Sequence, residues 1–367
     1  MRVYYFGIYN NNGGLENFAK NLIGCVSRLN KEINFTLLVT DEQFSYKEYF
    51  ENIGCDVVVL PNAHSRPLAF YKKLKAILSE ASNNDVAQLN ICSFRNPFLF
   101  LACIKSKIKT IVVGHYTKID DKKLKLAHFL NRRIFSKYFL CVSNSDDVTK
   151  FMFPKKQTIH FINNGIDIDR FSFNESYRAE IRNKLKVDSN TILIGQVGRI
   201  SPEKNQEFSI NVFKSIHQKY NNSKLVFVGK QMYDTPLNLA KHYLNDQTIE
   251  FVGPVYNGLE KYYSAFDIIL LPSKNEGFSL SMLECCCNGA LSFFSKEVPE
   301  LSVKLPNVHY LDLNESVWVD SISLEIQNNN HHDIRNCYLR NTVYELKKCA
   351  ESYIDIYFNY EKRKLNG

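Results

Sequence analysis

Two cationic side chains share one predicted loop in the second half of the chain and could neutralise a diphosphate. Residues 192–197 form an apolar run that predicts a strand, and a helix is predicted over residues 206–220. Arg199 and Lys204 lie in the loop between them. Ligands of parallel sheets bind beyond the carboxyl ends of strands, and a guanidinium can bind phosphate oxygens bidentately. This loop is therefore a candidate anion site.

Two glutamates flank a second predicted turn, which follows another apolar run. Glu276 precedes the expected start of a helix, and Glu284 lies inside that helix. Gly277 lets the backbone approach a ligand, while Ser279 and Ser281 suit a first helical turn, whose N–H groups lack partners within the helix. Carboxylates bind sugar hydroxyls well, so a sugar joined to a nucleotide would suit both glutamates. The alternative is that both are solvated surface residues.

A glycine turn near the N-terminus could approach a phosphate or a sugar. A strand is predicted over residues 2–9 and an amphipathic helix over residues 15–29, and the loop between them ends in Gly13 and Gly14. This loop lacks the G-x-G-x-x-G pattern, which argues against a dinucleotide dehydrogenase. A plain tight turn is the alternative for the two glycines.

His115 follows a strand that is predicted over residues 110–113. It therefore lies at the carboxyl end of a strand, where its side chain could contact a substrate. The alternative is a structural histidine that closes the strand.

The composition indicates a globular protein of two domains. The chain has 367 residues, too many for one ordinary core, and 45% of them are hydrophobic. No apolar run approaches the roughly 20 residues of a membrane helix. The N-terminus enters a predicted strand without a signal peptide, so we expect a cytoplasmic chain. The ten cysteines form no C-x-x-C pair, which argues against zinc and favours buried thiols.

Strands and helices alternate along the chain, which predicts an α/β fold with parallel sheets. Further strands are predicted over residues 34–40, 56–60, 86–92, 139–143, 159–162, 224–228, 249–252, 268–271 and 291–294, and helices over 43–53, 67–81, 260–266, 297–301 and 342–364. A charged, polar segment over residues 169–188 indicates the domain junction. We therefore predict domains over residues 1–165 and 166–341, followed by a C-terminal helix in 342–367.

Positive charge is concentrated in the first half of the chain. Residues 1–163 hold 23 Lys and Arg against 13 Asp and Glu, a net charge of +10, whereas the rest holds 23 against 25, a net −2. Seven cations lie in residues 118–137, together with an apolar side: Lys118, Lys122, Lys123, Lys125, Arg132, Arg133 and Lys137. A basic amphipathic helix can lie on an anionic membrane surface. The alternative is an ordinary core-facing helix with a solvated basic face.

Together, several short motifs resemble the retaining nucleotide-sugar glycosyltransferases of the group 1 type, the family 4 enzymes with the GT-B fold. The motifs occur in the family order over most of residues 160–300: Asn164–Gly165–Ile166–Asp167, Val197–Gly198–Arg199 with Lys204–Asn205, Val228–Gly229, Phe251–Val252–Gly253, and Leu271–Pro272–Ser273 leading to Glu276–Gly277–Phe278 and Glu284. Gly13–Gly14 with Glu16–Asn17–Phe18 is also similar to the family's N-terminal pattern. A departure is the run Cys285–Cys286–Cys287, where other small residues are usual.

The resemblance implies two Rossmann-like domains that face a central cleft. Residues 1–165 would bind the acceptor and residues 166–341 the nucleotide-sugar donor, a UDP-sugar by preference, with the helix in 342–367 packed back on the first domain. The implied catalytic residues are Arg199 and Lys204 at the leaving diphosphate, and Glu276 and His115 at the donor sugar. The remaining implied donor contacts are Gly13, Gly14, Gly229, Phe251, Val252, Gly277, Phe278, Ser279 and, at the ribose, Glu284.

The resemblance also implies transfer of a hexose with retention, through attack on the face from which the diphosphate departs. Within the family, the sequence is most similar to transferases of bacterial capsule, exopolysaccharide or O-antigen biosynthesis, whose acceptor is a glycan or a lipid-diphosphate-linked sugar. We expect no cofactor, no nucleic acid and no metal, because Arg199 and Lys204 would supply the positive charge. A nucleotide-sugar epimerase and a non-catalytic partner subunit are alternatives with the same architecture.

Overall fold

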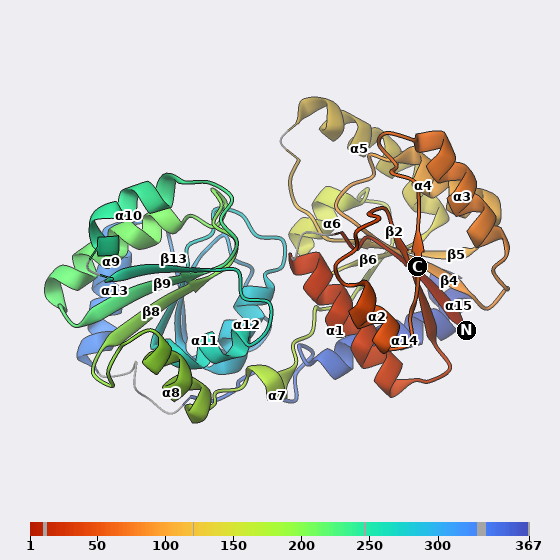
Figure 1. Ribbon diagram of the computed structural model, residues 1–367. Coiled ribbons are helices and arrows are strands. Elements are labelled where there is room, and N and C mark those ends of the chain that lie inside the picture. Colours follow the sequence, from red (N-terminus) through yellow and green to blue (C-terminus); the bar gives the residue numbers. More distant parts are fainter. Residues whose placement is uncertain (10–12, 120, 246, 329–334, 366–367) are drawn as a thin grey trace. The chain divides into compact units, whose positions relative to one another are not determined.

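The computed structural model describes residues 1–9, 13–119, 121–245, 247–328 and 335–365, and the chain divides into two compact units (Figure 1). Unit 1 comprises Met1–Gly165 with Leu346–Gly367, and unit 2 comprises Ile166–Glu345. Each unit is a parallel sheet with helices, as the alternation of predicted strands and helices indicates. Part of the predicted loop over residues 10–14 lies outside the described residues.

Unit 1 is built on a seven-stranded parallel sheet in the order β3-β2-β1-β4-β5-β6-β7. Its strands are β1 Arg2–Phe6, β2 Asn34–Val39, β3 Asp56–Val59, β4 Val86–Ile91, β5 Lys109–Gly114, β6 Leu140–Ser143 and β7 Ile159–Phe161. Its helices are α1 Gly14–Leu29, α2 Lys47–Asn52, α3 Pro67–Ser79, α4 Pro97–Ser106, α5 Lys122–Phe135, α6 Asp146–Met152, α14 Leu346–Phe358 and α15 Tyr360–Leu365. The strand order reverses between β1 and β4, and such a switch point is where open parallel sheets bind ligands.

Unit 2 is built on a six-stranded sheet in the order β10-β9-β8-β11-β12-β13. Its strands are β8 Ile192–Val197, β9 Ser223–Val228, β10 Ile249–Gly253, β11 Ile268–Leu271, β12 Leu291–Ser295 and β13 Val308–Leu311. Its helices are α7 Ile168–Phe171, α8 Glu175–Lys184, α9 Gln206–Lys219, α10 Thr235–Asn245, α11 Leu259–Ala265, α12 Leu280–Asn288 and α13 Glu315–Gln327. Here the order reverses between β8 and β11.

Apolar strands explain why both sheets are parallel and covered. Every residue of β8, β9 and β11 is buried, which requires helices on both faces of the sheet. In unit 1 the final helices complete that cover. Tyr353 of α14 packs edge-on against Phe18 of α1, and the hydroxyl of Tyr360 in α15 bonds the backbone of Thr110 in β5. Among the described residues, none of the helices combines the length and apolarity needed to cross a membrane.

Several predicted elements are wrong or incomplete. The single helix predicted over residues 342–364 is instead two helices. The first, α14, begins at Leu346, and Asn359 separates it from α15. No helix forms over residues 297–301, which follow β12 as the end of a turn and then irregular backbone. Helix α2 is shorter than the prediction over 43–53. Helices α4, α10 and α13 and strand β13 were not predicted.

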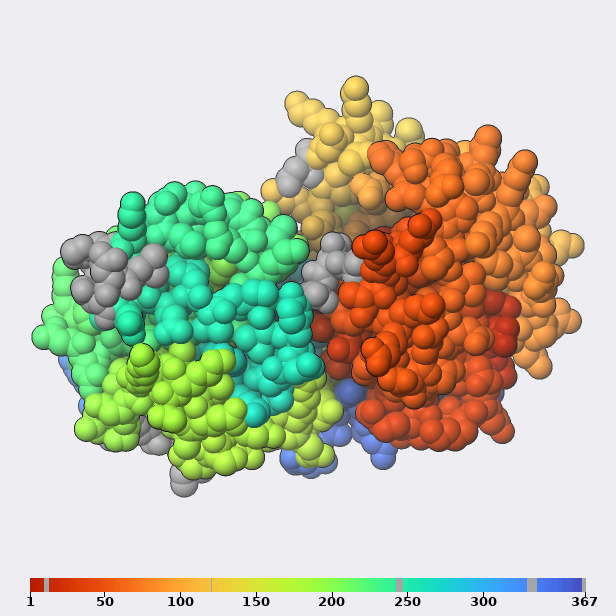
Figure 2. Space-filling view, in the orientation of Figure 1, coloured from red at the N-terminus to blue at the C-terminus, as the bar shows by residue number. Residues whose placement is uncertain are grey.

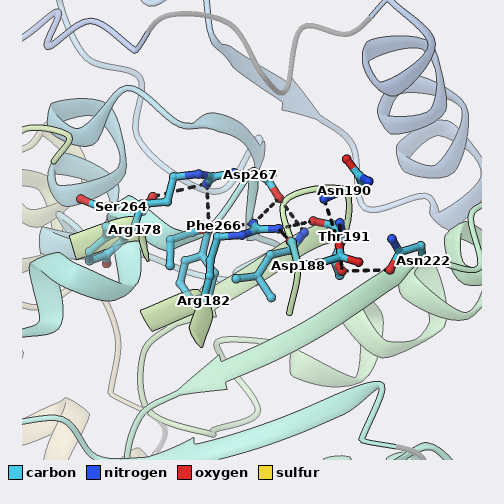
Figure 3. Close-up of polar contacts among 12 residues, drawn as sticks. Arg178, Arg182, Asp188, Asn190, Thr191, Asn222, Ser264, Phe266 and Asp267 are labelled. Atoms are coloured by element: carbon cyan, nitrogen blue, oxygen red, sulfur yellow. Dashed lines mark hydrogen bonds and ion pairs between the residues drawn. The ribbon is translucent and has the colours of Figure 1, made fainter. Parts of the chain in front are cut away.

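The charged segment over residues 169–188 is not a linker, because its arginines enter the interior of unit 2. Arg178 and Arg182 of α8 converge on Asp267, which directly precedes β11 (Figure 3). The two nitrogen–oxygen distances are 2.5 and 3.0 Å, and the Asp267 side chain is completely buried. Asp267 also accepts a hydrogen bond of 2.7 Å from the backbone N–H of Leu193 in β8. One carboxylate thus joins a helix to the amino ends of two adjacent strands.

The backbone around this carboxylate is bonded as well. Arg182 donates to the carbonyl oxygens of Asp188 and Thr191, and the Asp188 carboxylate accepts from the backbone and hydroxyl of Thr191 (Figure 3). Arg335 lies nearby and donates to the carbonyls of residues 263, 264 and 266, and burial lowers its pKa to about 10. Charged residues in this part of the sequence therefore stabilise a core instead of marking a boundary.

Replacement of Asp267 should destabilise unit 2 selectively. Asp267→Ala leaves two buried guanidinium groups without their carboxylate, and breaking a buried ion pair costs about 3–5 kcal/mol. The single tryptophan, Trp318, is buried in unit 2, so its fluorescence during urea unfolding reports that unit alone. Glu180→Ala is the matched control, because Glu180 lies on the same helix but pairs with Lys261 at the surface. Equal midpoints for the two variants would contradict this role of Asp267.

Candidate active site

The loop after β8 is held in place by two buried glutamine side chains. Gln196, within β8, donates a hydrogen bond of 2.7 Å from Nε2 to the carbonyl oxygen of Lys204. Gln206, the first residue of α9, donates from Nε2 to the carbonyl of Arg199 at 2.9 Å and accepts from the backbone N–H of Ser201 at 3.2 Å. The two glutamine side chains therefore hold both ends of the loop that carries Arg199 and Lys204.

A close backbone approach brings the loop after β9 against the loop after β8. A Cβ atom on Gly229 would lie 1.9 Å from the carbonyl oxygen of Gly198 and 3.2 Å from the backbone nitrogen of Arg199. Only glycine fits at this point without displacing the Arg199 loop. Gly229 is therefore required by its packing, whether or not it also contacts a ligand.

The structure brings Lys204 and Glu276 together. The Lys204 ammonium donates to Glu276 Oε1, which also accepts a hydrogen bond of 2.8 Å from the hydroxyl of Ser273. The two side chains of the ion pair are only 16% and 11% exposed. A further backbone bond of 2.8 Å, from Lys274 to Glu203, joins the same two loops. The loops after β8 and β11 thus form one polar cluster at the switch point of unit 2.

Arg199 lies in the same loop but is exposed. Its side chain makes no hydrogen bond or ion pair with the described residues, so its guanidinium donors face solvent. An anionic ligand could therefore bind the guanidinium of Arg199 without displacing a protein carboxylate, whereas the ammonium of Lys204 is paired with Glu276.

Glu284 lies on α12, the helix that follows the loop with Glu276. It is buried and accepts a hydrogen bond of 2.6 Å from the hydroxyl of Tyr263. Burial raises the pKa of Glu284, although the Tyr263 hydroxyl and the positive charges of Arg170 and Lys204 oppose that shift. Ser279 is the N-cap residue of α12, and its buried hydroxyl has no hydrogen-bond partner among the described residues.

The two aromatic residues that were predicted to contact the donor pack against other aromatic rings. Phe251 of β10 stacks on Phe227 with ring centroids 4.7 Å apart, and Phe278 stacks on Tyr344 at 6.4 Å. Val252 is half-buried in β10, which is the edge strand and lies beyond β9 from the Arg199 loop. Gly277 is half-buried in the turn between Glu276 and Ser279. Whether any of these residues contacts a ligand stays a prediction.

In unit 1, the glycine turn is closed by a glutamate that the sequence analysis did not assign to this role. Gly13 is the N-cap residue of α1 and Gly14 its first residue. The buried carboxylate of Glu16 accepts hydrogen bonds from the backbone N–H groups of Gly13 at 2.8 Å and Tyr9 at 3.1 Å. A side chain on Gly14 would meet no atom within 4 Å, so this residue leaves open space at the helix start.

His115 lies directly after β5 and contacts α1. Its ring packs edge-on against Phe18, with centroids 5.3 Å apart, and its Nε2 atom lies 3.1 Å from Oδ1 of Asn90. The ring keeps some exposed surface, but its burial among neighbouring atoms lowers the pKa of His115 to about 3. The imidazole is therefore neutral at neutral pH.

The described residues contain no group of three or more His, Cys, Asp or Glu side chains placed to hold a metal ion. One D-x-D pattern, Asp167–Ile168–Asp169, was overlooked in the expectation of a metal-free site. Asp167 caps α7 by accepting from the backbone of Arg170, and Asp169 pairs with Arg340 at 3.0 Å. Both aspartates thus have structural contacts.

Comparisons with known proteins identify the class of this site. Residues 177–300 match the family model of glycosyl transferases, group 1. Over these residues the chain is similar to that family. A protein of Bacillus subtilis (strain 168) that is named as a glycosyltransferase, EpsF, is 23% identical over 334 residues, which are 85% of this chain and 84% of EpsF.

Solved structures show that the chain has the GT-B fold. HepE from Anabaena, in a crystal structure with UDP, aligns over 100% of this chain and 98% of its own with a TM-score of 0.72 at 15% identity. A glycosyltransferase from Rickettsia africae aligns over 100% and 99% with a TM-score of 0.76 at 15% identity. The predicted fold class and the predicted similarity to group 1 glycosyltransferases are thereby confirmed, whereas retention stays a prediction. The assignment of individual residues to substrate contacts stays a prediction.

The two glutamates should affect nucleotide binding differently. Glu276→Gln frees Lys204 from its carboxylate, so UDP should bind equally well or up to about fivefold tighter, the scale of a partly exposed ion pair. Glu284→Gln removes a charged hydrogen-bond acceptor from the predicted ribose contact and should weaken UDP binding about tenfold. Calorimetry with UDP alone measures both.

A stability measurement shows whether Glu284→Gln acts on binding alone. Because burial raises its pKa, the ionised carboxylate is disfavoured in the folded chain, and this penalty applies at pH values above the ordinary carboxyl range. Glu284→Gln removes the penalty and should not lower stability at neutral pH. Equal losses of UDP affinity in both variants would contradict the division of roles.

Proposed function

We propose that this chain is a retaining glycosyltransferase that transfers a hexose from a UDP-sugar to a glycan or a lipid-diphosphate-linked sugar. The observation that carries the proposal is the polar cluster of unit 2, in which the Lys204–Glu276 ion pair and the loop that carries Arg199 lie at the strand switch point. Cations for a diphosphate and a carboxylate for sugar hydroxyls lie side by side there. HepE, which shares the fold, has been crystallised in complex with UDP and with UDP-glucose.

The proposed chemistry follows from where charge develops. Glycosyl transfer breaks the bond between the anomeric carbon and a phosphate oxygen, so negative charge grows on the departing diphosphate. Arg199 and Lys204 would stabilise that charge more in the transition state than in the bound donor, which is what accelerates the reaction. These fixed cations would perform the task that a metal ion performs in other transferases.

Retention is proposed through attack of the acceptor hydroxyl on the face that the diphosphate leaves. The new bond joins the acceptor oxygen to the anomeric carbon, and the departing phosphate oxygen takes the hydroxyl proton. Glu276 would hold a hydroxyl of the donor sugar, and Glu284 would hold the ribose. In unit 1, Gly13, Gly14 and His115 would provide further donor contacts.

Relatives support an acceptor from bacterial surface polysaccharide biosynthesis, such as a capsule or an exopolysaccharide. An enzyme of Escherichia coli, 28% identical over 163 residues that are 41% of this chain and 40% of its own, is named as a galactosyltransferase acting on GlcNAc-diphosphoundecaprenol. WaaG, which aligns with a TM-score of 0.65 at 13% identity over 97% of this chain and 99% of its own, is described as taking part in lipopolysaccharide biosynthesis.

Two other functions are compatible with the same fold. A structure from Listeria monocytogenes that is named as a UDP-N-acetylglucosamine 2-epimerase aligns with a TM-score of 0.67 at 12% identity. A non-catalytic partner subunit is the second alternative. Incubation with a panel of radiolabelled nucleotide-sugars separates the three functions, since the label is transferred, converted to an epimer or left unchanged.

Removing either cation of the cluster should slow transfer strongly. Arg199→Ala or Lys204→Ala should lower kcat by about two orders of magnitude, the scale for the loss of one transition-state stabiliser. Folding should be little changed, because both side chains reach solvent. The assay is repeated in EDTA, where wild-type activity should persist. Near-wild-type turnover of both variants, or an absolute need for Mn²⁺ or Mg²⁺, would refute the proposed role of these cations.

We further propose that α5 places the enzyme on an anionic membrane surface. Only His128 and Phe135 of this helix are buried, whereas Leu126, Leu130 and Ile134 are 62%, 52% and 52% exposed. These three apolar residues recur every fourth position and so form one row along the helix. Figure 2 shows α5, in gold, at the surface of unit 1. Contrary to an ordinary core-facing helix, α5 therefore presents much of its apolar side to solvent.

Basic residues flank that apolar row, as they do in helices that lie in a lipid interface. Lys122, Lys123, Lys125 and Arg133 are exposed. Arg132 differs, because it donates to the carbonyl oxygens of Lys150 and Phe151 and so anchors α5 to its own unit. Each exposed cation near an anionic leaflet contributes about 1 kcal/mol. Together with the apolar row, they favour reversible binding without a spanning helix.

Binding to vesicles should depend on these exposed cations. The wild-type chain should sediment with vesicles that contain anionic lipid and be released at high salt, which screens the attraction. Replacement of Lys122, Lys123, Lys125 and Arg133 by Gln should abolish sedimentation. The matched control replaces four other cations of unit 1, Lys72, Lys73, Lys155 and Lys156, by Gln. Equal recovery from the supernatant with anionic and neutral vesicles would refute membrane association.

A further inference from the structure

Two cysteine thiols meet at the end of α12, in the run of cysteines that departs from the family pattern. Cys287 lies near the end of α12 and is completely buried. Cys337, in the segment that leads from residue 335 to α14, is partly exposed. Their sulfur atoms lie 3.6 Å apart, although 50 positions separate them in the sequence. One sulfur atom can thus reach solvent, and the other lies directly behind it.

The chain around Cys337 is held against the end of α12 independently of the two thiols. Arg335 donates a hydrogen bond of 3.0 Å from Nη1 to Oδ1 of Asn288, the residue after Cys287. Gly289, the C-cap residue of α12, has a φ of +78°, and a Cβ atom there would lie 2.5 Å from the carbonyl oxygen of Asn336. Only glycine allows this approach. Packing therefore brings the two sulfur atoms together before any bond joins them.

The surroundings of Cys337 favour its thiolate. The thiol of Cys287 can donate to the Cys337 sulfur, and the backbone N–H groups of Leu339 and Arg340 also bond it. These donors lower the pKa of Cys337 to about 6, although burial opposes the shift. The contact with Cys337 and burial in turn raise the pKa of Cys287. At neutral pH the pair therefore holds one negative charge, mostly on the sulfur atom that solvent reaches.

Cys337 combines exposure with negative charge, and Cys92 provides the contrast. Of the ten cysteines, Cys92 and Cys337 are partly exposed and the other eight are buried. Burial raises the pKa of Cys92 to about 11, so its thiol stays protonated at neutral pH. The thiolate is the reactive form of cysteine. Cys337 is therefore the position at which an oxidant meets a sulfur atom that is both accessible and ionised.

We propose that Cys337 and Cys287 form a redox site, at which hydrogen peroxide converts the two thiols into a disulfide that fastens α12 to the segment before α14. Cys337 is the residue that reacts with peroxide, and Cys287 is the residue that closes the disulfide. The inference goes beyond the proposed function and does not depend on it, because a transferase, an epimerase and a partner subunit would carry the pair alike.

Oxidation proceeds in two steps. The Cys337 thiolate attacks one oxygen atom of hydrogen peroxide, the O–O bond breaks, and Cys337 becomes a sulfenic acid while the other oxygen leaves as hydroxide. The Cys287 sulfur then attacks the Cys337 sulfur, the S–O bond breaks, and the Cys287 proton leaves with the oxygen as water. Each sulfur atom loses one electron, and the peroxide gains both. The sulfur atoms need only approach from 3.6 Å to about 2.0 Å.

Alkylation measures the reactivity of Cys337 in the reduced protein. A limiting amount of iodoacetamide is added at pH 7, and mass spectrometry of the digested chain locates the label. Cys337 should be labelled at least about tenfold faster than Cys92, because only a small fraction of the Cys92 thiol is ionised. Labelling of Cys92 at the same rate as Cys337 would overturn the assignment of Cys337 as the reactive thiol.

Oxidation then tests the disulfide itself. The reduced chain is treated with hydrogen peroxide, free thiols are blocked, and the digest is analysed without reductant. We expect linked peptides that separate in dithiothreitol, with fragmentation spectra that show Cys287, and not Cys285 or Cys286, joined to Cys337. In Cys287→Ala, dimedone should instead trap a sulfenic acid on Cys337. Absence of the linked peptides from the wild type would overturn the inference, and so would a disulfide between Cys337 and another cysteine.

The disulfide should also stabilise unit 2. A cross-link between positions 50 apart restricts the unfolded chain, so the urea midpoint of Trp318 fluorescence should rise by on the order of 1 M after oxidation and return in dithiothreitol. Cys337→Ser should show no rise, whereas the matched control Cys92→Ser should behave as the wild type does. Because Cys337 is partly exposed, this variant keeps the test available if Cys287→Ala fails to fold. Equal midpoints of the oxidised and the reduced wild type would overturn the stabilising role of the pair.

Discussion

The buried carboxylate of Asp267 is the constraint on which the second unit depends. It holds Arg178, Arg182 and the backbone of Leu193 at the amino ends of β8 and β11. Arg199 and Glu276 follow the opposite ends of the same two strands. Fixing the strands at one end therefore fixes, at the other, the spacing of the loops that carry the Lys204–Glu276 pair. The buried cluster around Asp267 has no role in the proposed chemistry, but it sets the geometry of the Lys204–Glu276 cluster that is proposed to perform that chemistry.

Much of the fold and the location of the site could be predicted, because both depend on local patterns. Apolar runs predicted most strands of the two sheets, and the loops with Arg199 and Glu276 follow those strands directly. The nature of residues 169–188 could not be predicted in this way. Arginines and aspartates in sequence favour solvent, and only the folded chain shows that Arg178 and Arg182 meet a carboxylate that lies more than 80 residues later. Pairing between distant residues leaves no local signal.

Polar residues inside apolar strands were the signal that sequence analysis passed over. Gln196 in β8 and Gln88 and Asn90 in β4 are buried among aliphatic neighbours, where an amide is costly unless it is fully bonded. In both units such amides lie beside the strand switch point, and in both they bond to the loop or side chain proposed to meet substrate. The ion pair between Lys204 and Glu276 had no comparable signal, because each residue was assigned to a different part of the ligand.

The return of the C-terminal helices to unit 1 has a consequence for synthesis on the ribosome. All residues of unit 2 have been translated before Leu346 appears, so the domain that is encoded second can complete its fold first. All strands of unit 1 are translated much earlier. The hydrogen bonds of Gln88 with Tyr357 and of Thr110 with Tyr360 can form only after the C-terminal helices have been translated. A truncated chain that ends before α14 would therefore retain an intact second domain and leave the first with a gap in its cover. The last 22 residues are thus needed to complete the packing of the first 165.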